Sequence, residues 1–149
     1  MKIRRWTALA LALLLTLALC ACGGAAEDAE PQYRTAEELH QAMENGENLL
    51  LLDVQPQDQY DQHHIAGVTA TFAFPCDTPE TQAILKGYVK ELKQFDGDVI
   101  LICPMGKMGS GNAFDYFVSQ GVDPAKLYIL EGGQTGWPYE YEGTGPVEE

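Results

Sequence analysis

The chain has 149 residues, of which 22 are acidic and nine are basic, so its formal net charge is −13 at pH 7. This length fits one domain once a leader is subtracted. A chain this acidic is not expected to bind nucleic acid or anionic lipid headgroups through its charge. Small anions are also repelled at long range, so a site for one must be local and must use backbone donors.

The N-terminus has the pattern of an export signal. A positively charged start precedes an uncharged apolar segment, residues 6–19, and Ala21 places a small side chain directly before Cys22. This resembles the lipobox of bacterial lipoprotein signal peptides, which implies that residues 1–21 are removed and that Cys22 receives a diacylglycerol. The alternative is an uncleaved signal anchor, because residues 6–26 approach the length of a membrane span.

Either alternative tethers the domain to the cell membrane on its extracytoplasmic face, and two or more acyl chains make a lipid anchor stable. Without the leader, six basic and 22 acidic residues remain, a net charge of −16. We expect a lipidated N-terminus and flexible spacer over residues 22–32 and a loose acidic tail over residues 142–149. Beyond the lipidated cysteine only Cys76 and Cys103 remain, and outside the cytoplasm such a pair can form a disulfide.

The first half of the remaining chain alternates helix and strand signals. A capping-box pattern at residues 35–38 opens a helix that Asn45 and Gly46 end. The continuous apolar run at residues 49–54 predicts a strand that is covered on both faces, as in parallel sheets. One helical turn is expected at residues 58–63, and a second strand at residues 67–72.

The second half continues this alternation. Thr78 and Pro79 predict the N-cap and the first position of a helix whose apolar face reaches Leu92. A strand is expected at residues 99–102, an amphipathic helix at residues 112–120, and a last strand at residues 127–130. Strands that alternate with helices predict an α/β domain with a mainly parallel sheet, and we place this domain at residues 33–141.

The strand at residues 99–102 delivers Cys103 into a glycine-rich loop that opens a helix. Backbone N–H groups in such a loop and at a helix N-terminus stabilise negative charge, so they can lower the pKa of a thiol and hold an anionic sulfur substrate. The alternative is a small buried hydrophobe at a strand end, since free cysteines are among the most buried residues. The strand and the loop alone leave both alternatives open.

Three segments carry a family pattern, and their order and spacing are more specific than any one of them. They are Leu51 to Val54 with Tyr60 and His64 to Val68, then the Cys103 loop, then Leu130 to Gly133 with Trp137. Together they resemble the rhodanese domain of sulfurtransferases over roughly residues 31–141. The resemblance implies a single rhodanese-like domain with a five-stranded, mainly parallel sheet flanked by helices, in which the cysteine loop forms a semicircular cradle.

The resemblance also implies a reaction. The Cys103 thiolate attacks the sulfane sulfur of thiosulfate or a persulfide, and a Cys103 persulfide then passes the sulfur to an acceptor such as a protein thiol, which is covalent nucleophilic catalysis. No cofactor is implied. The backbone N–H groups of residues 105–109 form the implied cradle. The implied substrate-binding residues are Pro104, Met105, Gly106, Lys107, Met108, Gly109 and Ser110.

Several landmark residues are expected to be structural. Asp53 ends a strand and His64 follows a turn, so both are expected to order the chain through hydrogen bonds, and Trp137 is expected to pack against the C-terminal segment. His63 and His64 are adjacent but have no third ligand in the sequence, so no metal site is predicted.

The loop departs from the family pattern in ways that affect the donor. Met108 stands where members with an active loop have arginine or threonine, Gln55 stands where arginine follows Asp-Val, and Gly109 is an inserted residue that shifts Ser110 by one place. Lys107 is then the only cation in the loop, either as a solvated lysine or as a substrate ligand. A low-molecular-weight persulfide or a protein partner therefore fits at least as well as thiosulfate.

Two other functions are alternatives to sulfur transfer. Phosphatases built on this fold have a longer loop that ends in an arginine, which grips the phosphoryl group, and Gly109 stands at that place, so phosphatase activity is not expected. The alternative to an enzyme is a catalytically silent rhodanese-like module that binds a partner, with Cys103 free or in a disulfide with Cys76.

Overall fold

The computed structural model describes residues 29–144 of the chain. The predicted signal peptide at residues 1–21, the predicted lipidation at Cys22 and the start of the spacer lie outside the described residues, as does the end of the acidic tail. Within residues 29–144, no helix combines the length and the apolar character that crossing a membrane requires.

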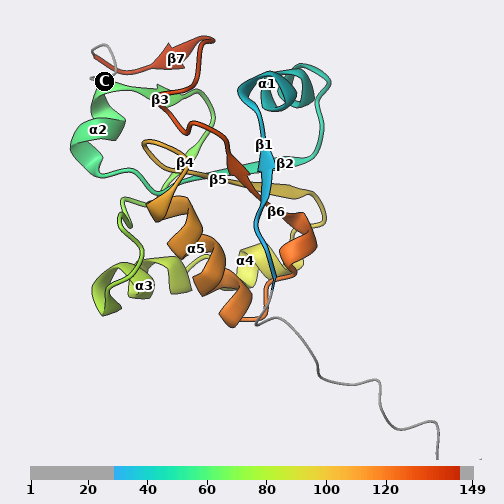
Figure 1. Ribbon diagram of the computed structural model, residues 1–149, viewed down its shortest axis with the longest axis vertical. Helices are drawn as coiled ribbons and strands as arrows, with labels where there is room; N and C mark the ends of the chain where they lie inside the picture. The colour runs from blue at the N-terminus through green and yellow to red at the C-terminus, as the bar shows by residue number, and fades with distance from the viewer. Residues whose placement is uncertain (1–28, 145–149) are drawn as a thin grey trace, which may run out of the picture.

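Five strands form one sheet in the order β1-β6-β5-β2-β4 (Figure 1). Every neighbouring pair in this sheet is parallel. The expected fold class, an α/β domain with a five-stranded parallel sheet, is therefore confirmed. The strands are β1 (Gln32–Arg34), β2 (Leu49–Asp53), β4 (Thr69–Ala70), β5 (Asp98–Ile102) and β6 (Leu127–Leu130).

Helices cover both faces of the sheet. Figure 1 shows α3, α4 and α5 together on one side and α1 on the other. A small antiparallel sheet, β3 (His64–Ile65) with β7 (Tyr141–Glu142), lies near α2. The helices are α1 (Ala36–Glu44), α2 (Gln57–Gln62), α3 (Pro79–Lys86), α4 (Val89–Gln94), α5 (Met108–Ser119) and a short 3-10 turn, Pro124–Lys126.

Side chains of the central strands alternate between two apolar cores. Leu101 of β5 packs in the core that holds Phe117 of α5, whereas its neighbour Ile100 packs in the core that holds Leu39 of α1 and Trp137. All five side chains are at least nine-tenths buried. Because each strand is covered on both faces, its sequence is apolar throughout rather than alternating.

The predicted starts of α1 and α3 are confirmed. Thr35 caps α1, since its hydroxyl accepts from the Glu38 N–H and the Glu38 carboxylate accepts from the Thr35 N–H at 2.8 Å. Thr78 caps α3 in the same way, and Pro79 occupies the first turn. These caps satisfy backbone donors that have no partner inside the helix.

Two boundary predictions are wrong, and the single helix expected to reach Leu92 is two helices, α3 and α4, separated by Gly87 and Tyr88. The last long helix begins at Met108, four residues earlier than expected, because the Gly111 N–H donates to the Lys107 carbonyl at 2.8 Å and closes a first turn. Two glycines in that turn hide the helix from a propensity argument. The strand expected over residues 67–72 is only β4, because Phe72 takes a positive φ of 58° and leaves extended geometry.

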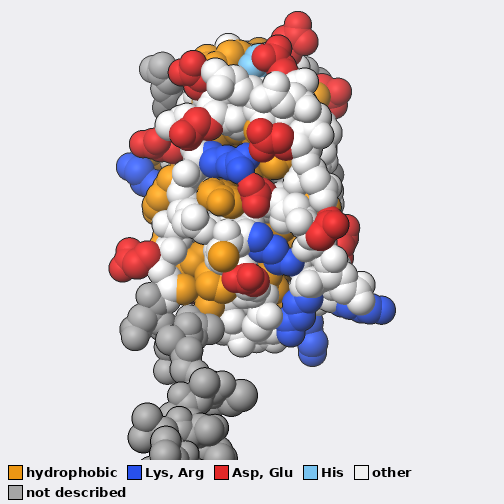
Figure 2. All heavy atoms as spheres, turned by 90° about the vertical axis from the view of Figure 1, so that its right-hand side faces the viewer, with side chains coloured by type: hydrophobic (Ala, Val, Ile, Leu, Met, Phe, Trp, Pro, Cys, Tyr) orange, Lys and Arg blue, Asp and Glu red, His pale blue; other side chains and the backbone are white. Residues whose placement is uncertain are grey.

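Three short strands, β1, β3 and β7, were not predicted from the sequence. β1 is held to the sheet by Arg34, whose guanidinium pairs with Asp98 and lies 4.7 Å from the ring centroid of Tyr128. Figure 2 shows the face that carries β1 and α1, with acidic side chains scattered over it between small apolar patches. The negative charge on this face is therefore dispersed.

Candidate functional site

The predicted nucleophile lies at the carboxyl edge of the sheet. β5 ends at Ile102 and α5 begins at Met108, so Cys103 to Lys107 connect a central strand directly to a helix N-terminus. Ligands in open parallel sheets bind at this edge. The Cys103 side chain is only 2% exposed and belongs to the core shared with α5.

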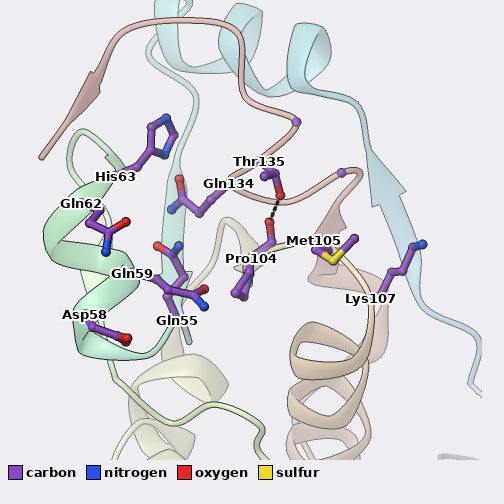
Figure 3. A pocket seen from close by; sticks show the side chains of 12 residues that line it. Gln55, Asp58, Gln59, Gln62, His63, Pro104, Met105, Lys107, Gln134 and Thr135 are labelled. Carbon is purple, nitrogen blue, oxygen red and sulfur yellow. Dashed lines mark hydrogen bonds between the residues drawn. The ribbon is translucent and has the colours of Figure 1, made fainter. Parts of the chain in front are cut away.

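The Cys103 loop is fixed by the turn that follows β6. The Gln134 N–H donates to the Cys103 carbonyl at 3.0 Å, and the Thr135 N–H donates to the Pro104 carbonyl at 3.0 Å. The Thr135 hydroxyl donates to the same carbonyl (Figure 3). Gly133 has a φ of +57°, and a Cβ there would overlap the Cys103 carbonyl oxygen. Glycine at this position therefore permits the contact that shapes the loop.

The first turn of α5 lies against the Cys103 side chain. A Cβ on Gly109 would lie 3.1 Å from the Cys103 Cβ and 2.8 Å from the ring of Phe74. Lys107, the N-cap, makes no side-chain hydrogen bond to the helix. The first-turn N–H groups are therefore free of side-chain capping, and such groups favour negative charge. Ser110 uses its hydroxyl elsewhere, donating to the Leu101 carbonyl at 3.3 Å.

Cys76 is the other cysteine within residues 29–144. Both cysteines are free and buried in the same core, so the predicted alternative of a disulfide is not present in this structure. Burial raises the pKa of Cys76 to about 12, and the charges of Cys103 and Asp77 add to the shift. A thiol with this pKa is almost entirely protonated at neutral pH and is a poor nucleophile.

A cavity of about 750 Å³ opens beside the loop, between α2 and the turn after β6 (Figure 3). Of the predicted substrate-binding residues, Pro104, Met105 and Lys107 line it. The other four, Gly106, Met108, Gly109 and Ser110, do not line it, and neither does the predicted nucleophile, Cys103. In Figure 3 the Lys107 side chain lies at the opposite side of the site from α2.

Behind the cavity, Asp53 is the centre of a buried hydrogen-bond network. Its Oδ1 accepts from the Gln55 N–H at 2.8 Å, and its Oδ2 accepts from the Gln134 side-chain amide at 2.7 Å. The Gln55 side-chain amide, oriented toward its acceptors, donates to Asp53 Oδ2 at 2.8 Å and to the His63 carbonyl at 3.3 Å. Burial raises the pKa of Asp53 to about 6, although these bonds oppose the shift. The structural role expected for Asp53 agrees with this geometry.

Two polar atoms in the cavity wall have no hydrogen-bond partner among the described residues. They are His63 Nδ1 and Gln134 Oε1, and both atoms are buried. Burial is the main cause that lowers the pKa of His63, which keeps the ring neutral at pH 7. His64, in contrast, is held by a 2.7 Å bond between its Nδ1 and the Tyr60 carbonyl, as expected for a structural histidine. Within residues 29–144, no three metal-ligating acidic, histidine or cysteine side chains cluster.

The sequence did not single out the glutamines of this site. Gln59 and Gln62 come from α2, Gln55 from the end of the adjoining loop, and Gln134 from the turn after β6. Isolated glutamines give no motif, because only the sheet topology brings these four together. In the sequence, Gln55 stands out only because it replaces the arginine of the family pattern.

The fold and the site define a class: an α/β domain in which one cysteine connects a central parallel strand to a helix N-terminus beside a cavity. The model of the rhodanese-like domain family matches residues 35–140, and the chain belongs to this family. The family membership that the three landmark segments implied is thus confirmed. None of the curated proteins compared with the chain is a significant match.

Solved structures share this fold. The rhodanese-like domain of an Anabaena protein is 23% identical, with a TM-score of 0.60 over 78% of this chain and 81% of its own. A thiosulfate sulfurtransferase from Pseudomonas aeruginosa is 16% identical, with a TM-score of 0.58 over 76% of this chain and 20% of its own. A Saccharomyces cerevisiae homolog of single-domain rhodanese and the Cdc25 phosphatase catalytic domain is 24% identical, with a TM-score of 0.54 over 71% and 78%.

Proposed function

We propose that the chain is a sulfurtransferase that carries sulfane sulfur as a persulfide on Cys103. The observation that carries the proposal is the place of Cys103, directly between β5 and the uncapped first turn of α5. That turn offers backbone donors to a thiolate or a persulfide anion. Family membership supports the same chemistry, since one member of the fold is a thiosulfate sulfurtransferase.

The reaction has two displacement steps. The Cys103 thiolate attacks the outer sulfur of the donor, the donor sulfur–sulfur bond breaks, and its electron pair leaves on sulfite or on a thiolate. An acceptor thiolate then attacks the terminal sulfur of the Cys103 persulfide, and the breaking bond returns the electron pair to Cys103. Each step forms one sulfur–sulfur bond and breaks one, so no external oxidant or cofactor is needed.

The site lacks the arginine that binds phosphate in phosphatases of this fold. Gly109 stands where the phosphatase pattern has arginine, and a Cβ at this position would press on the Phe74 ring. An arginine therefore cannot be accommodated without moving Phe74 or the helix start. Bidentate guanidinium contacts supply much of phosphate recognition, and this site has no substitute for them.

The second candidate function is a binding module without chemistry. The observation that favours it is that Cys103 is only 2% exposed and does not line the cavity. A donor in the cavity contacts the loop at Pro104, the next residue, so sulfur transfer requires a local opening around Cys103. A silent module requires no such opening.

A turnover assay separates the two candidates. The full chain is incubated with a persulfide donor and an excess of a thiol acceptor, and the persulfide formed on the acceptor is measured over time. A sulfurtransferase produces it catalytically, Cys103→Ser abolishes this activity, and Cys76→Ser keeps it. A wild-type rate equal to the uncatalysed rate contradicts sulfur transfer and favours the binding module.

The proposal includes a place for the enzyme: the extracytoplasmic face of the cell membrane, held by acyl chains on Cys22. β1 begins at Gln32 on the amino edge of the parallel sheet, whereas Cys103 lies at the carboxyl edge. A tether that joins β1 therefore enters the domain at the edge of the sheet opposite the site. The ten residues 22–31, from the lipidated cysteine to the start of β1, span at most about 36 Å when fully extended. Labelling cells with an alkyne fatty-acid analogue should mark the wild-type chain, and Cys22→Ala should remove the label.

A further inference from the structure

We propose that the cavity binds a thiol or persulfide whose organic part is uncharged and bears an amide, and that four glutamines and His63 select this molecule over thiosulfate. The proposal rests on the proposed function for its sulfur chemistry and names the substrate class. The residues that argue for it are Gln55, Gln59, Gln62, His63 and Gln134, all of which line the cavity.

The charged side chains of the cavity wall do not favour binding of a dianion such as thiosulfate. Of the residues that line the cavity, only Asp58 and Lys107 carry a full charge at neutral pH, and the two signs cancel. His63 is neutral, and Asp53 adds negative character behind the wall. Because the chain as a whole is strongly acidic, thiosulfate gains nothing from long-range attraction.

The unpartnered atoms of the wall match an amide. Gln134 is 1% exposed and His63 is 3% exposed, and neither Gln134 Oε1 nor His63 Nδ1 has a hydrogen-bond partner of good geometry, although the Gln134 side chain is close enough to His63 to oppose the burial that lowers the pKa of the ring. A buried polar atom without a hydrogen bond is costly, so a bound ligand that supplies the bond is favoured. Since Gln134 donates its own amide N–H to Asp53, its oxygen is left to accept, and a ligand amide N–H is a suitable donor.

Further amides extend the match along α2. Gln59 and Gln62 lie on the exposed side of that helix and face the cavity, where each offers one acceptor and two donors. Figure 3 shows these side chains on the α2 side and Gln134 across from them. A ligand amide has one donor and one acceptor, so it can bond to both sides at once. Thiosulfate has acceptors only and leaves Gln134 Oε1 unpartnered.

The volume of the cavity also favours an amide-bearing thiol over thiosulfate. At about 750 Å³ it falls within the range of pockets that hold drug-sized ligands, roughly 300–1,000 Å³. An anion of a few atoms fills a small part of this space. A thiol with one or two amide groups fills more of it and can direct its sulfur to the Cys103 loop.

Titration calorimetry on the full-length Cys103→Ser chain in detergent tests binding without sulfur transfer. The probes are N-acetylcysteine amide, 2-mercaptoethanol as an uncharged thiol without an amide, and thiosulfate. We expect N-acetylcysteine amide to bind at least tenfold more tightly than either of the other two. Equal or tighter binding of thiosulfate overturns the proposal.

Variants place the bound amide. Gln134→Met and Gln59→Ala should each weaken N-acetylcysteine amide binding about three- to tenfold, the value of one hydrogen bond. Gln57→Ala is the matched control, because Gln57 belongs to the same helix but does not line the cavity, and its affinity should equal that of the parent. Unchanged affinity in both cavity variants overturns the proposal and leaves His63 Nδ1 and Gln134 Oε1 to pair with each other.

The proposed function is measured separately, as sulfur loading of Cys103 in the wild-type chain. Absence of loading together with tight amide-thiol binding contradicts the sulfurtransferase and supports the ligand class. Loading of Cys103 without preferential amide-thiol binding supports the sulfurtransferase and contradicts the proposed ligand class. The two failures are therefore distinguishable.

Discussion

Gly109 lies beside Cys103: a Cβ added to Gly109 would lie 3.1 Å from the Cys103 Cβ and 2.8 Å from the Phe74 ring. From the sequence alone, Gly109 is an insertion that displaces Ser110. In the structure it is what allows the start of α5 to approach the thiol, and the proposed stabilisation of a Cys103 thiolate depends on this approach.

Two alanine substitutions in the same helix should have opposite effects on stability. Gly109→Ala puts a methyl group 2.8 Å from the Phe74 ring, so overpacking should lower the free energy of unfolding by about 1–3 kcal/mol. Gly111→Ala meets nothing within 4 Å and should raise it by about 0.5–1 kcal/mol, because alanine loses less backbone entropy. Urea denaturation of both variants measures the pair. Equal changes in the free energy of unfolding would show that the Phe74 ring does not exclude a side chain at Gly109.

Cys76 should resist alkylation in the folded chain. Its pKa of about 12 leaves only about one part in ten thousand as thiolate at pH 8, and its side chain is buried. Peptide mapping after iodoacetamide treatment should therefore find Cys76 unmodified under native conditions and fully modified in denaturant. Rapid native labelling of Cys76 would contradict its environment in this core.

Asp53 should give the folded chain a distinct pH dependence. Its folded pKa of about 6 lies above the ordinary 3.8, so the folded state binds this proton more tightly than the unfolded state. The resulting stability is present below about pH 4 and is lost as the pH rises to about 6, by at most about 3 kcal/mol.

Asp53→Asn cannot ionise, so it should lack this component of the pH dependence. Urea denaturation at several pH values, with the wild-type curve compared with the variant curve, isolates the contribution of this carboxyl. Asp58→Asn, at an exposed position of α2, is the control and should keep the wild-type profile. If Asp53→Asn also keeps it, the carboxyl is ionised equally in both states.

Met108→Arg should improve the use of thiosulfate. Met108 is 57% exposed at the first position of α5, so an arginine fits and adds a cation at the rim of the loop. An exposed charge pair is worth up to about 1 kcal/mol, which predicts a rise of about fivefold in kcat/KM for thiosulfate. The rise should shrink as salt is added. Met108→Gln, which is uncharged, should show no rise.

Much of the fold could be predicted because it depends on local patterns. The continuous apolar strands report a sheet covered on both faces, and Thr35 and Thr78 announce helix starts that the structure reproduces. The start of α5 could not be predicted, because Gly109 and Gly111 weaken the helix signal. Packing of Gly109 on Phe74 and the Ser110 bond to Leu101 fix it instead.

The candidate site was predicted only in part. The Cys103 loop could be predicted from its strand and its glycines. The opposite wall of the cavity could not, because it forms only where the fold brings Gln134 near α2. A hydrogen bond from Gln134 to Asp53 joins residues 81 positions apart, and nothing local announces it. For the same reason the exposure of Cys103, which depends on how Phe74 and α5 close over it, could not be predicted from the chain.

Mass spectrometry of the protein after sulfur loading is the most direct test of a persulfide on Cys103. The full chain is incubated with a persulfide donor, freed of small molecules, and analysed by intact mass and peptide mapping under non-reducing conditions. The account predicts a gain of one sulfur atom on the peptide that contains Cys103, the same gain in Cys76→Ala and none in Cys103→Ala. No gain in the wild-type chain, or a gain located on Cys76, would contradict it.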